Sequence, residues 1–300
     1  MALNQIPANC TAAGCKNGPN YFSNGAYLCG THCRNQPRVK VDKSLRPSPA
    51  ETPFAPPISR GPGNGLVALT QIKGLFGKVD SYDGYLKIFP NYKHGDRKDG
   101  IGLPDLSPMR LGPVVHGQKD RFGNLLPPSL NLENFHQANK VFAHYDIDPI
   151  SNQLNGNFYA GRVARYLDSI PHRHKYDDLK KAPPLYSIWS DSNSQEHIID
   201  YVTSRQFYCN FYERLTRDNP SLLKLREFLA NGYCLQICGY DAYPIELKLK
   251  PDGVIENISE AIDRTYLDPT HPFGHERVLM TILLLHPEQY PWRKYKTFEF

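Results

Sequence analysis

The chain lacks any long apolar run. No stretch of about 18 consecutive residues is both apolar and uncharged, so the sequence predicts no membrane-spanning helix and no membrane partner. The first residues, Met1 to Gln5, contain neither the basic segment nor the apolar core that begins a secretory signal. We therefore expect an intracellular protein, either cytoplasmic or nuclear.

Internal repeats and a glycine-rich phosphate loop are also absent. The glycines from Gly61 to Gly65 follow no predicted strand and open no predicted helix, so they are typical of a linker. Most of the chain carries no excess charge. Residues 1–50 hold six Lys and Arg against one Asp, which accounts for the net charge of +5 of all 300 residues. A basic N-terminal segment predicts contact with nucleic-acid phosphates, although a short basic segment can also be a solvated linker.

Four of the seven cysteines lie close together in this segment, namely Cys10, Cys15, Cys29 and Cys33. Two pairs of thiolates at such short spacing can each supply half of a tetrahedral Zn²⁺ site. Structural zinc is the favoured interpretation, and two disulfides or free thiols are the alternatives. The missing secretory signal argues against disulfides. Because four protein ligands leave no open position on the metal, we expect a recognition module and not a catalytic centre.

The rest of the chain can bury a sizeable core, since 40% of the residues are apolar and 12% aromatic. We predict a zinc module at 1–45, a Pro- and Gly-rich linker at 46–65 and a domain at 66–300. Periodicity and breaking residues predict the following elements of that domain: helices near 130–144, 157–169, 195–217, 221–231 and 274–286, strands at 233–238 and 245–249, and a hairpin of 78–80 with 85–89. The expected fold class is α+β with a predominantly helical core.

The segment from Asn131 to Phe142 carries the most informative polar pattern. Glu133, Gln137 and Lys140 are spaced i, i+4 and i+7, so a helix places them on one stripe. A carboxylate, an amide and an ammonium then point the same way. Ordinary helix-surface charge is the alternative interpretation of this pattern.

This segment resembles the signature E-[HN]-[YF]-x-Q-A-x-K-x-F of the NADAR/YbiA-like family, whose members cleave N-glycosidic bonds. The similarity continues in the same order downstream and spans roughly residues 106 to 286. Two departures stand out. Pro108 replaces the Asn of the family's Phe-Ser-Asn-Phe, and the Trp-Gly that follows the family's Asp is missing after Asp241. The similar downstream stretches are Arg205 to Tyr212, Asp218 to Gly232, Leu235 to Asp241 and Gly274 to Met280.

The resemblance implies a YbiA-like fold and an N-glycosidase acting on an ADP-ribosylated or phosphoribosylated base, which can belong to a nucleic acid. Glu133 would orient the ribose or activate water, Lys140 would hold a phosphate or adjust the pKa of Glu133, and Asp241 would add a second carboxylate. The residues expected to bind substrate are Ser107, Gln137, Arg162 and Arg173. Arg173 belongs to a cationic stretch, 171–176, that could clamp a diphosphate or form a solvated turn.

Two other functions remain open from the sequence. The chain could be a non-catalytic nucleotide- or nucleic-acid-binding protein that keeps the fold, and the two departures from the family pattern favour this. Alternatively, it could be a structural zinc protein whose helical core is unrelated to the family. The intact Glu133, Gln137 and Lys140 favour the enzyme.

Overall fold

The computed structural model describes residues 21–23, 26–28, 39–40, 65–73, 77–174 and 183–298. The chain divides into two compact units, Met1–Pro56 and Pro57–Phe300, and each is described by itself. The first unit contains a short antiparallel sheet in the order β2-β1-β3, with β1 at Tyr21–Ser23, β2 at Ala26–Leu28 and β3 at Val39–Lys40. The four cysteines predicted to bind zinc lie outside the described residues.

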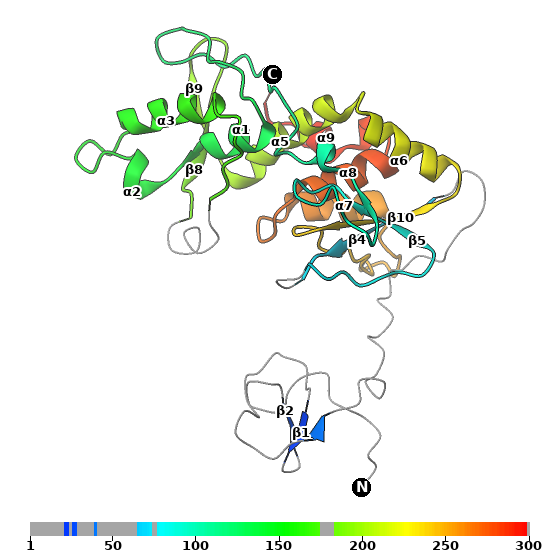
Figure 1. Ribbon diagram of the computed structural model, residues 1–300. Helices are drawn as coiled ribbons and strands as arrows, with labels where there is room; N and C mark the ends of the chain where they lie inside the picture. Colours follow the sequence, from blue (N-terminus) through cyan, green and yellow to red (C-terminus); the bar gives the residue numbers. More distant parts are fainter. Residues whose placement is uncertain are drawn as a thin grey trace. The chain divides into compact units, whose positions relative to one another are not determined.

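The second unit contains a four-stranded sheet in which every pairing is parallel (Figure 1). Its strand order is β4-β10-β5-β6, with bounds Val67–Gln71, Cys234–Gly239, Tyr85–Phe89 and Ile101–Gly102. Every residue of β10 is buried, as expected for a central strand of a parallel sheet. Helices α6 (Pro220–Ala230) and α8 (His275–Leu284) pack against this strand.

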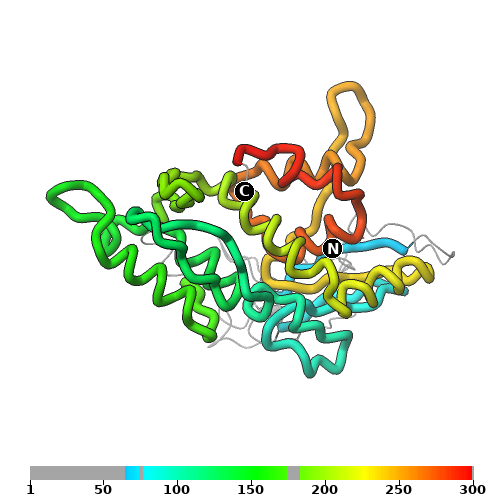
Figure 2. Tube along the Cα trace, turned by 90° about the horizontal axis from the view of Figure 1, so that it is seen from above, coloured from blue at the N-terminus to red at the C-terminus, as the bar shows by residue number. Residues whose placement is uncertain are grey.

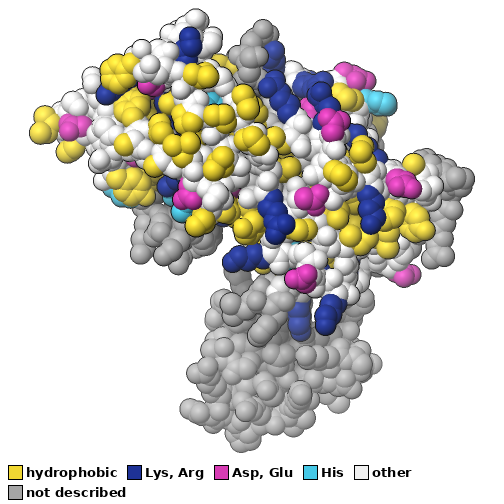
Figure 3. Space-filling view, turned by 45° about the horizontal axis from the view of Figure 1, so that its top comes forward, with side chains coloured by type: hydrophobic (Ala, Val, Ile, Leu, Met, Phe, Trp, Pro, Cys, Tyr) yellow, Lys and Arg dark blue, Asp and Glu magenta, His cyan; other side chains and the backbone are white. Residues whose placement is uncertain are grey.

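A lobe lies beside this sheet and extends away from it, as Figure 2 shows. It contains an antiparallel sheet in the order β7-β8-β9, with bounds Lys140–Val141, Tyr186–Ser190 and Glu196–Ile199. Its helices are α1 (Leu132–Ala138), α2 (Ala143–Asp146) and α3 (Gly156–Tyr166). Hydrophobic side chains are numerous on the face of this lobe seen in Figure 3.

Helix α5 (Tyr201–Thr216) joins the lobe to the sheet. It contacts α1 and β8 of the lobe, and also α7 (Ile258–Leu267), α8 and α9 (Pro291–Lys294). On the lobe side, the ring of Phe211 lies 4.9 Å from that of Phe135, and the ring of Phe207 lies 4.2 Å from that of Trp189. These rings belong to the same buried cluster as residues of the parallel sheet and α8, so the second unit has one continuous core across both parts.

Several predicted elements are confirmed: the helices near 157–169, 221–231 and 274–286 and the strand near 233–238 correspond to α3, α6, α8 and β10. The helix predicted at 130–144 ends early because the Asn139 side chain donates to the Phe135 carbonyl and Lys140 pairs with Ser187 in β7. The helix predicted from 195 begins at Tyr201, since the residues before it form β9.

Two predictions were wrong. Residues 85–89 do not form a hairpin with 78–80, because β5 pairs in parallel with β10 and β6. No strand forms at 245–249, where Leu249 makes a single bridge with Ile255. Strands β4 and β8 and helix α7 were not predicted, and the second unit is a mixed α/β structure in which helices accompany two sheets. In the described part of the chain, no helix has the length and apolar character needed to cross a bilayer.

Candidate functional site

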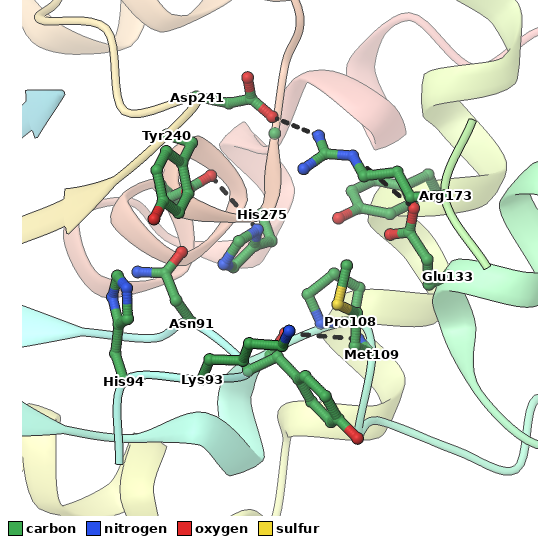
Figure 4. Close-up of a pocket in the computed structure, with 15 residues that line it drawn as sticks. Asn91, Lys93, His94, Pro108, Met109, Glu133, Arg173, Tyr240, Asp241 and His275 are labelled. Atoms are coloured by element: carbon green, nitrogen blue, oxygen red, sulfur yellow. Dashed lines mark hydrogen bonds and ion pairs between the residues drawn. The ribbon is translucent and has the colours of Figure 1, made fainter. Parts of the chain in front are cut away.

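A cavity of about 210 Å³ opens at the carboxyl ends of β5 and β10 (Figure 4). A cavity of about 10–15 Å³ already holds one water, so this one can admit a small organic molecule. Three segments contribute from the sheet side: Asn91 to His94 follow β5, Tyr240 and Asp241 follow β10, and Gly274 to Glu276 begin α8. The carboxyl ends of parallel strands are where open α/β sheets usually bind ligands.

The lobe contributes Glu133 and Arg173 to the opposite side of the cavity (Figure 4). Helix α1 begins where the Asn131 side chain accepts a hydrogen bond from the Asn134 backbone, which places Glu133 in the first turn. The Asn134 side chain in turn holds the segment before Arg173. Its amide donates to the carbonyls of Asp168 and Ile170, both at 2.9 Å, and its oxygen accepts from the His172 backbone at 2.7 Å.

Arg173 links two carboxylates that come from different parts of the fold. Its Nη2 donates to Asp241 Oδ2 at 3.0 Å, and its Nε lies 4.0 Å from Glu133 Oε1. Burial by itself lowers the pKa of Arg173, but the carboxylates of Glu133 and Asp241 raise it on balance. Arg173 thus connects an acidic group of the lobe with one of the sheet side, and its positive charge offsets their mutual repulsion.

Gln137 and Lys140 extend a hydrogen-bonded chain from Glu133, and neither of them lines the cavity. Gln137 Nε2 donates to Glu133 Oε1 at 2.8 Å, and Lys140 Nζ donates to Gln137 Oε1 at 3.0 Å. Burial lowers the pKa of Lys140 to about 8, opposed by Glu133 and assisted by Arg173 and Arg165. Glu133 is 6% exposed, so the polar stripe is a buried network and not an exposed helix face.

Glu276 is a third carboxylate of the cavity, and it is only 1% exposed. Its Oε2 lies 3.2 Å from His275 Nδ1, while His275 Nε2 lies 2.9 Å from the Pro90 carbonyl. Since a carbonyl can only accept, Nε2 carries a proton. Nδ1 of His275 faces the Glu276 carboxylate, and the two form an ion pair only when the ring is charged.

Two lining residues hold buried polar atoms that lack a hydrogen-bond partner within the described residues: Glu276 Oε2 and His94 Nδ1. Burial and the nearby Arg97 lower the pKa of His94, which favours the neutral ring. Buried polar atoms are nearly always hydrogen-bonded to protein, water or ligand. These two atoms are therefore candidates for direct contact with a bound molecule.

Some of the site residues predicted from sequence line the cavity. Ser107, Glu133, Arg173 and Asp241 line it, while Gln137 and Lys140 lie behind Glu133. Arg162 does not line it. Its side chain is buried, its Nη1 donates to Ser190 Oγ at 3.2 Å, and its guanidinium lies 5.3 Å from the Phe158 ring centroid.

Sequence reasoning missed most of the sheet side, including Asn91, Lys93, His94, Tyr240, His275 and Glu276. The available signal was that the first three follow one strand and Tyr240 follows another, which would place them at one edge if the strands were parallel. The hairpin prediction concealed this relation. Among the described residues, no group of three or more His, Cys, Asp or Glu side chains could hold a metal ion.

Comparisons of the chain with protein-family models, with curated proteins and with solved structures find no match.

Proposed function

We propose that the protein is an N-glycosidase that hydrolyses the bond between a base and the ribose of an ADP-ribosylated or phosphoribosylated substrate. The observation that carries the proposal is the pair of carboxylates, Glu133 and Asp241, which line one cavity and are connected by Arg173. The resemblance to the NADAR/YbiA-like family implies the same two acids, Glu133 through the segment 131–142 and Asp241 through the stretch that begins at Leu235.

The chemistry follows from the transition state. As the C1′–N bond breaks, positive charge develops on the ribose, and a nearby carboxylate stabilises it. In the proposed reaction Asp241 supplies this charge, while Glu133 takes a proton from the attacking water. The hydroxyl bonds to C1′, and the base leaves with the bonding electron pair and gains a proton.

The sheet side of the cavity has groups suited to the leaving base. His275 lines the cavity, and its ring can donate a proton to the leaving base when the ring is charged. Glu276 Oε2 lies 3.2 Å from His275 Nδ1 but makes no hydrogen bond to a described residue, so it can accept from an N–H group of the base. Lys93 and Arg173 add positive charge for the phosphates of the substrate.

The test is turnover by Glu133→Gln and Asp241→Asn on a panel of N-ribosylated, phosphoribosylated and ADP-ribosylated bases, with released base measured by chromatography. We expect a rate loss on the order of 10²–10³ for each variant. Glu227→Gln is the matched control, since Glu227 is exposed on α6 and does not line the cavity. Wild-type rates in both site variants would refute the assigned roles.

A non-catalytic nucleotide- or nucleic-acid-binding protein is the second candidate function, and Arg173 favours it. Its guanidinium occupies the space between the two carboxylates that a sugar would need. Calorimetry with ADP-ribose separates the two functions. Binding without turnover of any substrate on the panel, weakened by Arg173→Gln, is the result that the binding protein predicts.

For the N-terminal segment, we propose structural zinc on Cys10, Cys15, Cys29 and Cys33 and a role in recruiting the domain to its substrate. Support comes from the cysteine spacing and the local excess of positive charge.

A further inference from the structure

A second hollow, of about 400 Å³, lies between α5 and the C-terminal segment. Its residues on α5 and just beyond are spaced i, i+3, i+4 and i+7, so they form one stripe: Asn210, Glu213, Arg214 and Arg217. Trp292, Arg293 and Lys296 complete it. Tyr208, which lines the first cavity, is two residues from Asn210 and therefore points about 200° away around the helix. The two hollows are on opposite sides of α5.

The charges of this groove are mostly positive. Four of its seven lining residues are Arg or Lys, and Glu213 is its one acidic residue. Glu213 is neutralised within the protein, because its carboxylate accepts from Trp292 Nε1 at 2.9 Å and forms an ion pair with Arg293. The guanidinium groups of Arg214 and Arg217 belong to exposed residues. Uncompensated cations in a hollow attract anions.

The groove offers contacts to phosphate and not to bases. Its one aromatic residue, Trp292, is fully buried and bonded to Glu213, so it presents no face on which a base could stack. Arg supplies the planar set of donors that suits phosphate oxygens. Arg214 and Arg217 are spaced i and i+3 on one stripe at the end of α5, so they can contact two neighbouring phosphates of a chain.

We propose that this groove binds the phosphodiester backbone of a nucleic-acid strand without reading its sequence. The site is separate from the glycosidase cavity and does not depend on the function proposed there. It places nucleic-acid contact on the second unit, whereas the sequence pointed only to the basic N-terminal segment.

The experiment measures binding of the full chain to a fluorescent oligothymidine of about 12 nucleotides by anisotropy, over a range of KCl concentrations. We compare wild type with the double variant Arg214→Gln/Arg217→Gln. Each lost phosphate contact on a single strand flattens the plot of log K against log salt by about 0.7, so we expect a slope shallower by about 1.4 and affinity reduced on the order of tenfold at low salt.

Three controls define the result. Arg121→Gln/Lys248→Gln removes the same charge from exposed residues outside both hollows and should change the slope little. Arg214→Lys/Arg217→Lys should restore most of the salt slope. Glu227→Gln, at an exposed residue that lines neither hollow, should bind the strand as wild type does.

Several outcomes would overturn the proposal. One is an unchanged slope in the Arg214→Gln/Arg217→Gln variant, with binding lost instead in Lys40→Gln/Lys43→Gln. Another is wild-type affinity weaker than about 1 mM at low salt. A third is inorganic pyrophosphate that competes at equal concentration of phosphate groups, which would indicate a site for a small phosphate and not for a strand.

Discussion

At the scale of single residues, the Gln137 side chain connects the Glu133 carboxylate with the Lys140 ammonium through two hydrogen bonds. It donates to the carboxylate and accepts from the ammonium, and it is 6% exposed. Gln137→Met keeps the volume but leaves Lys140 Nζ without this acceptor. Losing the partner of a buried donor costs about 1–3 kcal/mol, so we expect a loss of that size in the free energy of unfolding, measured with urea. Asn210→Met is the control and should change it less, because Asn210 is only half-buried on α5 and gives up one hydrogen bond to the Gln206 carbonyl.

The lowered pKa of Lys140 makes stability depend on pH in a defined window. The folded pKa is about 8 and the ordinary value is 10.5, so between them the unfolded chain binds more protons than the folded one. The buried ammonium therefore lowers the free energy of unfolding. This decrease is complete below pH 8, and it disappears as the pH rises towards 10. Its size is at most about 3 kcal/mol.

The measurement is the difference in unfolding free energy between wild type and Lys140→Met at several pH values. We expect wild type to gain on the variant as pH rises from 8 to 10. Taking the difference removes the contribution of tyrosines, which titrate in both proteins. A difference that stays constant across this window would contradict a lowered pKa for Lys140.

At the scale of elements, the end of β10 is fixed by the close approach of α8. A Cβ on Gly239 would lie 1.8 Å from Glu276 Oε1 and 2.4 Å from its Cγ, and Glu276 is buried, so it has little room to move. We expect Gly239→Ala to lower the free energy of unfolding by about 1–3 kcal/mol and to displace Glu276 from the cavity. Gly161→Ala is the control.

Gly161 lies inside α3, and a Cβ there meets nothing within 4 Å. Alanine should therefore stabilise the helix by about 0.5–1 kcal/mol. Thermal melting of the two variants should shift in opposite directions. Equal and small shifts would show that α8 adjusts easily and that the position of Glu276 is not fixed by β10.

The same elements explain which parts of the fold could be predicted from sequence. Helices α3, α6 and α8 have clear starts, such as the Asn219 cap followed by Pro220, and these signals are local. Strand β4 is buried at four of its five residues, so it shows no alternation, and its parallel partner β10 lies more than 160 residues away in the chain. Pairing at that distance leaves no local pattern.

The residues of the candidate site likewise differ in whether the sequence alone could predict them. Glu133 and Gln137 could be predicted because one helix sets their spacing. Asp241 and Arg173 were named separately, but their ion pair at 3.0 Å depends on how the lobe meets the sheet across α5. Glu276 gave no signal in the sequence, since its role depends on Gly239 and His275 lying beside it.

At the scale of the whole molecule, the core described for the second unit draws all its members from residues 67–298. A chain that begins at Pro57 should therefore fold by itself. We expect its thermal midpoint to lie within about 2 °C of that of the full chain, as checked by calorimetry, since a surface change of about 0.5 kcal/mol moves a large domain by only 1–2 °C. A large drop would show that the N-terminal unit supports this core.

Zinc in the N-terminal segment can be tested by counting reactive thiols, because the chain contains its own internal control. Cys209, Cys234 and Cys238 are buried, so they should react slowly in the native protein whether or not metal is present. If the remaining four of the seven cysteines hold zinc, native protein should contain about one zinc per chain and show almost no fast thiols. A chelator should then release the metal and expose four fast thiols, while melting of the second unit stays unchanged. Four fast thiols before any chelator, together with less than about a tenth of an equivalent of zinc, would remove the proposed site.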